Sequence, residues 1–255
     1  MHPILIKIGP VAVYSYGVMV SLGAGLAAFL IYRRAGELGF AKDRVIDLVV
    51  LLLMSGIVGA RLFYVTLNLP YYATNIFEIF DLTKGGLVWY GGFLAALSAL
   101  IWYTVKRRLN FWVLADLMVP YLALAQAFGR IGCFLNGCCY GIEAPRGHPL
   151  GVTFPQDSHI LRYPTQLYSS LVLLLIFVLL RIWQDNRRFV GEIFLGYCIL
   201  YAAKRFLMEF LRGDNRKVFA GLTIFQIISI AVLTAALSIF IYKTALWKKK
   251  ISALR

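Results

Sequence analysis

Seven long apolar stretches occupy most of this chain of 255 residues. Each stretch is close to the ~20 residues that a helix needs to cross a bilayer, at a rise of about 1.5 Å per residue. Their apolar residues do not alternate with polar ones as in a lipid-facing barrel strand, so we expect helices. The seven expected transmembrane helices cover residues 11–32, 45–67, 86–105, 111–134, 164–182, 190–212 and 221–242.

The composition excludes a soluble globular protein. Hydrophobic residues make up 60% of the chain and charged residues only 15%, whereas soluble domains carry roughly 25% charged residues. The seven stretches account for nearly the whole chain, so we expect one membrane-embedded domain over residues 1–255. The expected fold class is therefore all-α, a polytopic membrane protein with seven transmembrane helices.

The excess of positive charge indicates how the chain is oriented. The 26 Lys and Arg against 12 Asp and Glu give a net charge of +14. Most of these cations fall on one side of the membrane if the helices alternate in direction, and cytoplasmic segments carry such an excess. We therefore expect the N-terminus outside, the C-terminus in the cytoplasm and no nucleic acid partner. The cations on that side are Arg33, Arg34, Lys42, Arg44, Lys106, Arg107, Arg108, Arg181, Arg187, Arg188, Lys243, Lys248, Lys249, Lys250 and Arg255.

A second group of cations lies within the apolar stretches, where a charge facing lipid costs several kcal/mol. In the expected topology they all lie towards the outer leaflet. Single arginines can snorkel to the headgroups, but three helices carrying them together favour a buried polar site. Glu209 follows Arg205 by one helical turn and can partly neutralise it. The cations of this group are Arg61, Arg130, Lys204, Arg205 and Arg212.

Aromatic residues at the outer ends of the same helices sharpen this expectation. Tyr16 begins the first stretch, and Tyr90 begins the third beside a Gly-Gly pair. Interfacial aromatics are common in membrane helices, and glycine pairs there usually mark close packing. Together with the arginines they suggest an outer-leaflet cavity for an anionic headgroup, because guanidinium groups grip phosphate bidentately.

The densest motif is GRIGCFLNGCCYG at Gly129–Gly141. It resembles the signature of the bacterial prolipoprotein diacylglyceryl transferases. Six further strings match that family in the same order along the chain: Tyr16-Gly17, Gly59–Leu62, Gly85–Gly92, Tyr163–Tyr168, Arg205–Asp214 and Gly221–Gln226.

This resemblance implies an enzyme of the bacterial cytoplasmic (inner) membrane with its active site towards the outer leaflet. The implied reaction moves a diacylglyceryl group from phosphatidylglycerol to the lipobox cysteine thiol in the signal peptide of a preprolipoprotein, the first step of lipoprotein maturation. It needs no cofactor and releases glycerol phosphate. The implied catalytic residues are Tyr90, Arg130, Arg205 and Glu209, and the implied lipid- or phosphate-binding residues are Tyr16, Arg61, Asn136, Gly141 and Arg212.

Three residues depart from the family pattern, with Cys133 in place of asparagine, Cys138 in place of glutamate and Tyr90 in place of histidine. Cys133 can pair with Cys138 or Cys139 in a disulfide, remain a packed thiol, or take part in redox chemistry. The spacing C-x4-C-C has no histidine nearby and is unlike the usual zinc patterns, so we expect no metal.

These cysteines leave two alternatives to the transferase open. One is a membrane thiol oxidoreductase that uses Cys133, Cys138 and Cys139 with a quinone, although the chain lacks a C-x-x-C pair. The other is a divergent, non-catalytic paralogue. A small-anion transporter is disfavoured, because the two halves of the sequence show no paired repeat.

Overall fold

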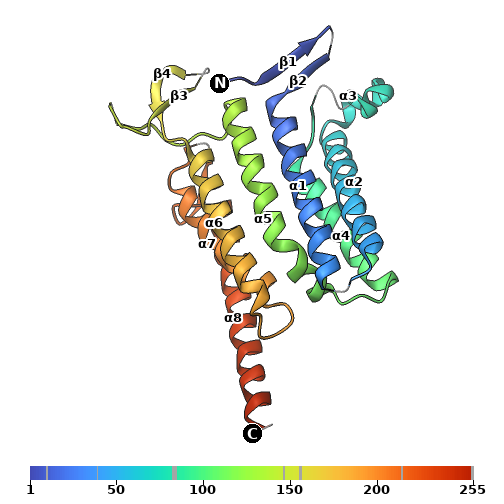
Figure 1. The fold of residues 1–255 in the computed structure, drawn as a ribbon. Helices are drawn as coiled ribbons and strands as arrows, with labels where there is room; N and C mark the ends of the chain where they lie inside the picture. The colour runs from blue at the N-terminus through green and yellow to red at the C-terminus, as the bar shows by residue number, and fades with distance from the viewer. Residues whose placement is uncertain are drawn as a thin grey trace. The chain divides into compact units, whose positions relative to one another are not determined.

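The structure, a computed structural model, describes residues 1–9, 11–38, 40–81, 85–145, 147–154, 157–213 and 215–253. Long helices dominate it (Figure 1). The helices are α1 (Ser15–Glu37), α2 (Lys42–Leu67), α3 (Leu69–Thr74), the 3-10 helix η1 (Ile76–Phe80), α4 (Trp89–Lys106), α5 (Phe111–Asn136), α6 (Thr165–Asp185), α7 (Glu192–Glu209) and α8 (Ile224–Ser252).

A long helix occupies each of the seven apolar stretches expected from the sequence. Five of these helices, α1, α2, α5, α6 and α8, are long and apolar enough to cross a membrane. The other two, α4 and α7, have 18 residues each. The mostly helical fold and five candidate membrane spans are thus shown, while the full number of seven spans and the direction of the chain stay predictions.

The described residues also form three short antiparallel hairpins, one before α1, one between α5 and α6 and one between α7 and α8. They are formed by β1 (Ile4–Ile8) with β2 (Val11–Tyr14), β3 (Val152–Phe154) with β4 (Asp157–Arg162), and β5 (Lys217–Phe219) with β6 (Leu222–Thr223).

Several expected helix boundaries were wrong. The first helix begins at Ser15 and not at residue 11, because residues 4–14 are rich in β-branched side chains that suit an extended pair of strands. The helix expected over 190–212 ends at Glu209, and Arg212 pairs with Gly141 in an isolated β-bridge. The last helix begins only at Ile224, after a capping box formed by Thr223 and Gln226, and continues to Ser252.

Contacts divide the chain into two compact units. The first unit comprises Met1–Leu30 and Ala115–Arg255, and the second comprises Ile31–Leu114. The first unit therefore contains α6 to α8 together with most of α1 and of α5, and the second contains α2 to α4. The expectation of a single domain stays a prediction.

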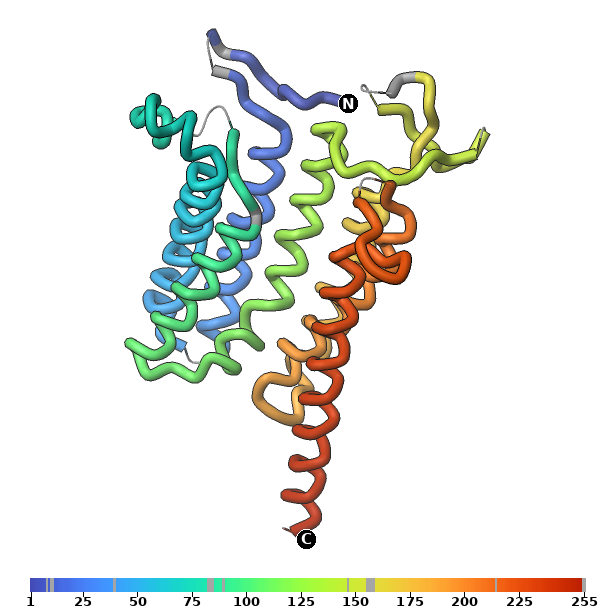
Figure 2. Tube along the Cα trace, turned by 180° about the vertical axis from the view of Figure 1, so that it is seen from behind, coloured from blue at the N-terminus to red at the C-terminus, as the bar shows by residue number. Residues whose placement is uncertain are grey.

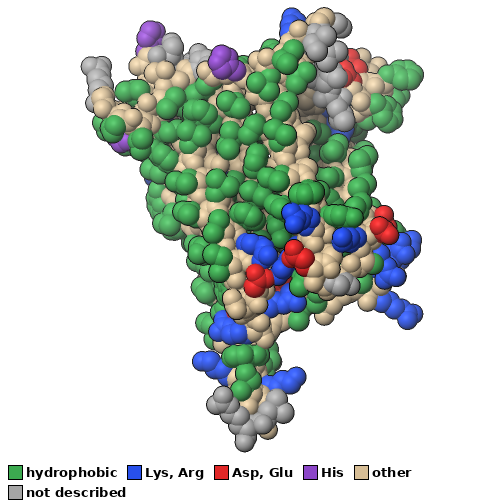
Figure 3. Space-filling model, in the orientation of Figure 1, with side chains coloured by type: hydrophobic (Ala, Val, Ile, Leu, Met, Phe, Trp, Pro, Cys, Tyr) green, Lys and Arg blue, Asp and Glu red, His purple; other side chains and the backbone are tan. Residues whose placement is uncertain are grey.

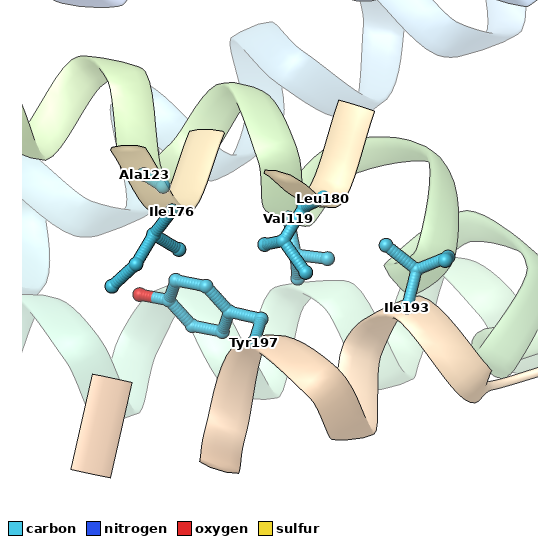
Figure 4. Close-up of a cluster of buried hydrophobic side chains, with 6 residues drawn as sticks. All are labelled: Val119, Ala123, Ile176, Leu180, Ile193 and Tyr197. Atoms are coloured by element: carbon cyan, nitrogen blue, oxygen red, sulfur yellow. The ribbon is translucent and has the colours of Figure 1, made fainter. Parts of the chain in front are cut away.

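The core of the first unit lies where α5, α6 and α7 meet (Figure 4). Lipid tails are as apolar as a protein core, so close packing and hydrogen bonds between helices drive association inside a membrane. Both are present: Ser170 donates to the carbonyl of Ala127 at 3.0 Å, and the Tyr197 hydroxyl donates to Oε1 of Gln126 at 3.0 Å. The packed side chains are Val119, Ala123, Ile176, Leu180, Ile193 and Tyr197.

A buried carboxylate joins α5 to the start of α7. Asp116 is fully buried, and its two oxygens accept hydrogen bonds from the backbone N–H of Gly191 at 2.7 Å and of Phe194 at 2.9 Å. Negative charge at the start of a helix is favourable, because the free N–H groups point towards it. Asp116 therefore caps α7 from a neighbouring helix.

Helix α8 lies beside α7 and extends past it (Figure 2). Hydrophobic side chains cover much of the visible face along α6, while Lys and Arg side chains gather around the C-terminal part of α8 (Figure 3). This distribution is typical of a helix whose shaft lies in lipid and whose end reaches the headgroups.

In the second unit, α2 and α4 cross at glycines. A Cβ placed on Gly59 would lie 2.6 Å from the carbonyl oxygen of Gly91, and one on Gly91 would lie 2.4 Å from the carbonyl oxygen of Gly59. Neither backbone can move away without separating the helices, so both positions require glycine. The close packing expected from these glycines is confirmed.

Candidate active site

The GRIGCFLNGCCYG motif folds as the last turns of α5 followed by a tight turn. Arg130, Cys133 and Asn136 lie on α5, and the helix ends at Asn136. The N–H of Cys138 then donates to the carbonyl of Cys133 at 3.1 Å, which folds the chain back over the helix end. Residues 137–141, called the signature turn below, therefore stay next to Arg130 and Cys133.

The first turn of α6 fixes the signature turn from the other side. The buried Gln166 side chain donates from Nε2 to the carbonyl of Cys138 at 2.7 Å, and the buried Thr165 hydroxyl donates to the carbonyl of Cys139 at 3.0 Å. Buried carbonyls need such partners, since an unpaired polar group costs free energy in a low-dielectric interior. The turn is therefore a fixed part of the first unit.

Gly141 ends the signature turn in a space that no other residue can occupy. Its N–H donates to the carbonyl of Tyr163 at 2.9 Å, and it forms a bridge with Arg212. A Cβ at this position would lie 2.7 Å from the carbonyl oxygen of Leu211 and 2.8 Å from that of Tyr163. Gly141 thus lets the turn, the start of α6 and the chain after α7 meet.

The C-terminal end of α7 carries a buried ion pair. Nη1 of Arg205 lies 3.2 Å from Oε2 of Glu209, one helical turn away. The other oxygen, Oε1, accepts hydrogen bonds from Thr223 at 2.8 Å and from Nδ2 of Asn215 at 2.7 Å. The guanidinium group of Arg205 also lies over the ring of Phe225, 4.3 Å from its centre. Glu209 therefore holds Arg205 in one orientation.

Four cations gather between the end of α5 and the end of α7. Lys204 is buried and lies within electrostatic range of Arg130, Arg205 and Arg212. Glu209 supplies one negative charge among these four positive ones. Like charges repel strongly where water is scarce, so this arrangement favours binding of an anion. The sequence places Lys204 inside an apolar stretch but does not assign it to the site, because nothing in the sequence shows which way its side chain points.

The three cysteines of the motif form a compact group. All four cysteines of the chain are free thiols, and the sulfur atoms of Cys133, Cys138 and Cys139 lie within 4.8 Å of one another. Cys139 has a left-handed backbone with a φ of 63°, which is unfavourable for a residue with a side chain and persists only where its surroundings enforce it. The disulfide considered from the sequence is not formed in this structure.

Tyr16 lies next to this group in the first turn of α1. A Cβ on Gly132 would come within 3.2 Å of the Tyr16 ring, so α1 and α5 are in close contact at this level. Tyr16 is within electrostatic range of Arg130 and of the three cysteines, yet almost half of its surface is exposed. The structure thus brings Tyr16, Arg130, Asn136, Gly141, Arg205, Glu209 and Arg212 together in the first unit.

Arg61 and Tyr90 belong to the second unit. Arg61 is buried, and all five of its N–H groups donate to backbone carbonyls, at 2.6 to 3.2 Å. These carbonyls belong to Glu78, Ile79, Asp81, Gly85 and Gly86. Tyr90 lies in the first turn of α4 with an exposed side chain.

Comparison with known proteins supports the family resemblance that the motifs indicate. The family model described as prolipoprotein diacylglyceryl transferase matches residues 3–242. The chain belongs to this family. It is 33% identical to the phosphatidylglycerol–prolipoprotein diacylglyceryl transferase of Clostridium tetani over 98% of this chain and 100% of the relative. It is 34% identical to the second such enzyme of Clostridium perfringens, over 94% of each chain.

Cys133 and Cys138 depart from the diacylglyceryl transferase pattern expected from the sequence. In the structure they lie together with Cys139, and Arg130 and Arg212 are close to this group. Three thiols therefore lie next to the cationic side chains of this family member.

Proposed function

We propose that this protein transfers the diacylglyceryl group of phosphatidylglycerol to the lipobox cysteine of a preprolipoprotein signal peptide. The reaction forms a C–S bond and breaks the C–O bond to phosphate, with the thiol proton passing to the glycerol phosphate that leaves. The observation that carries this proposal is the group of four cations around one carboxylate in a chain of this family.

The four cations and the residues around them take different parts in the proposed reaction. Arg130, Arg205 and Arg212 hold the phosphate and stabilise the charge that grows on it as the C–O bond breaks. Lys204 adds positive charge from its buried position. Glu209 keeps Arg205 oriented and is therefore a positioning residue. Tyr16 and Asn136 lie beside the thiols, where the acceptor cysteine has to arrive, and Gly141 gives the turn its shape.

The two site residues of the second unit take different parts. All five N–H groups of Arg61 donate to backbone carbonyls. This supports a structural role for Arg61 in the segment before α4, in place of the direct phosphate contact expected from the sequence. Tyr90 is a candidate proton carrier, since its side chain is exposed and a phenolic hydroxyl can both donate and accept a proton.

We further propose that seven helices span the bacterial inner membrane, with the N-terminus outside and the site in the outer leaflet. The positive side chains between α1 and α2, between α4 and α5, after α6 and at the end of α8 support this direction. Single cysteines introduced at His2 and at Lys250 test this orientation through their accessibility to an impermeant thiol reagent. Labelling of Lys250→Cys in intact spheroplasts would contradict the proposal.

The activity itself is tested by complementation. A strain depleted of its own transferase is supplied with this gene, and a model lipoprotein is examined by mass spectrometry. We expect the mass of one diacylglyceryl group on its cysteine. An unmodified lipoprotein, despite normal amounts of the protein in the membrane, would favour the non-catalytic paralogue.

A further inference from the structure

The three thiols at the signature turn have the arrangement of a metal site. In a tetrahedral zinc site with Zn–S bonds of about 2.3 Å, neighbouring sulfurs lie about 3.8 Å apart. The sulfurs of Cys133, Cys138 and Cys139 all lie within 4.8 Å of one another. Closing around an ion therefore needs movements below about 1 Å, within the freedom of a side-chain torsion.

The backbone holds these thiols together without help from a metal. Cys138 is tied to Cys133 by a backbone hydrogen bond of 3.1 Å. The carbonyls of Cys138 and Cys139 are held by Gln166 and Thr165, and the left-handed backbone of Cys139 turns its side chain towards the other two. Such preorganisation lowers the entropy lost on binding.

Positive side chains near the three cysteines compensate the negative charge that a metal site of three thiolates would carry. Three thiolates and one divalent cation sum to a charge of −1, and Arg130 and Arg212 both lie within electrostatic range of Cys139. The three cysteines are neither fully buried nor fully exposed, so a fourth ligand can approach the ion. Thiolate sulfur selects soft cations such as Zn²⁺ over Mg²⁺ or Ca²⁺.

We propose that Cys133, Cys138 and Cys139 bind one Zn²⁺ ion, and that the cysteine of the incoming acceptor occupies its fourth position. The inference deepens the proposed function and rests on it for the identity of the acceptor. Three protein ligands with one open position are typical of catalytic zinc. A thiol that coordinates a metal is deprotonated outright, which supplies the nucleophile that the transfer needs.

The step balances without any redox change. The acceptor thiol gives up its proton on binding, and its sulfur forms a bond with the glyceryl carbon. The C–O bond to phosphate breaks, and its electron pair stays with the phosphate, which the neighbouring arginines hold and which takes up one proton. The sequence spacing disfavoured a metal because it offered no fourth protein ligand, but here the substrate supplies that ligand.

Metal binding can be measured without the reaction. The reduced protein in detergent is stripped with a chelator and titrated with Co²⁺, whose thiolate complexes have charge-transfer and visible bands, and then with Zn²⁺. We expect one Co²⁺ per chain, displaced by one Zn²⁺. The variants Cys133→Ser, Cys138→Ser and Cys139→Ser should each lose more than the ~10–100-fold in affinity that removing an outer-shell partner costs.

Cys198→Ala is the matched control, because Cys198 packs in α7 against the helical core and should leave the titration unchanged. A synthetic lipobox peptide added to the Co²⁺ form should shift the visible bands, and the same peptide with serine for cysteine should not. Bands that do not respond to the thiol peptide would overturn the assignment of the fourth position.

Absence of stoichiometric Co²⁺ binding, or equal binding by wild type and the three serine variants, would overturn the metal site. A disulfide that forms on oxidation in place of metal binding would do the same and favour thiol redox chemistry. Since these readouts need no lipid donor, a protein that binds Zn²⁺ but lacks transferase activity would refute only the proposed function.

Discussion

The carboxylate of Glu209 lies 3.2 Å from Nη1 of Arg205 and has no exposed surface. A buried pair of this kind is worth little by itself, but breaking it leaves an uncompensated charge in the interior. The pair therefore links the stability of the C-terminal end of α7 to the orientation of an arginine that we assign to the phosphate.

Glu209→Ala should lower the free energy of unfolding by about 3–5 kcal/mol, measured by unfolding in detergent micelles. Glu209→Gln retains an oxygen that can accept from Thr223 and Asn215, so we expect it to fold more stably than the alanine variant. Its activity should still fall, since Arg205 loses its counter-charge. A glutamine variant with wild-type activity would show that the charge of Glu209 is not needed.

Arg130→Lys and Arg205→Lys should each lose most of the transferase activity. Lysine keeps the positive charge but replaces a planar fork, which grips phosphate through two parallel hydrogen bonds, with a point charge. Formation of lipidated peptide from phosphatidylglycerol in nanodiscs measures the effect. Near wild-type turnover in both variants would remove the phosphate role assigned to these residues.

Gly141→Ala should abolish activity and destabilise the first unit, because its Cβ would collide with the backbone of Leu211 and Tyr163. The control is Gly25→Ala in α1, where the added methyl group meets no atom within 4 Å and alanine favours the helix. Melting temperatures of both variants in detergent compare them. Equal melting temperatures would contradict the packing described at Gly141.

Arg61→Lys should destabilise the second unit by about 3 kcal/mol or more, since lysine has three donors and hydrogen bonds to charged groups contribute ~1.5–3 kcal/mol each. The segment around η1 should also become sensitive to limited proteolysis. Arg44→Lys, at an exposed position of α2, serves as the control. A stable, protease-resistant Arg61→Lys variant that nevertheless binds lipid poorly would restore the phosphate contact expected from the sequence.

Tyr90→Phe should lower turnover by ~10²-fold if its hydroxyl carries a proton in the reaction. Folding should be unchanged, since the side chain is exposed and only one oxygen is removed. Tyr242→Phe, at an exposed position in α8, should leave turnover as in the wild type. Unchanged turnover in Tyr90→Phe would contradict this role.

The sequence predicted the long helices well, because a bilayer-spanning helix needs an apolar run of about one fixed length. It also predicted one group containing Arg130, Arg205 and Glu209, since charged groups inside apolar stretches avoid lipid, and in the structure these three lie near one another. Both inferences depend on local composition and helical spacing, which are readable from the chain alone.

Contacts between distant segments could not be predicted in this way. The sequence around Glu209 does not reveal that the Thr223 hydroxyl donates to its carboxylate. In the same way, the sequence around Cys139 does not reveal that the Thr165 hydroxyl donates to its carbonyl. The carbonyls that surround Arg61 could not be predicted for the same reason, because an arginine bound to backbone carbonyls leaves no mark in the sequence of the residues that supply them. The β1–β2 hairpin was hidden because its apolar residues continue directly into α1.

The cap that Asp116 places on α7 has a mechanical consequence. Asp116 lies 14 residues before Arg130 on α5, a separation of about 21 Å along the helix, and it secures the end of α7 opposite to Arg205 and Glu209. A tilt of about 5° around this attachment would displace the arginine-bearing ends by about 2 Å. The cap therefore ties α5 to α7 at a point distant from these arginines, so a small change of angle there is amplified where the arginines lie.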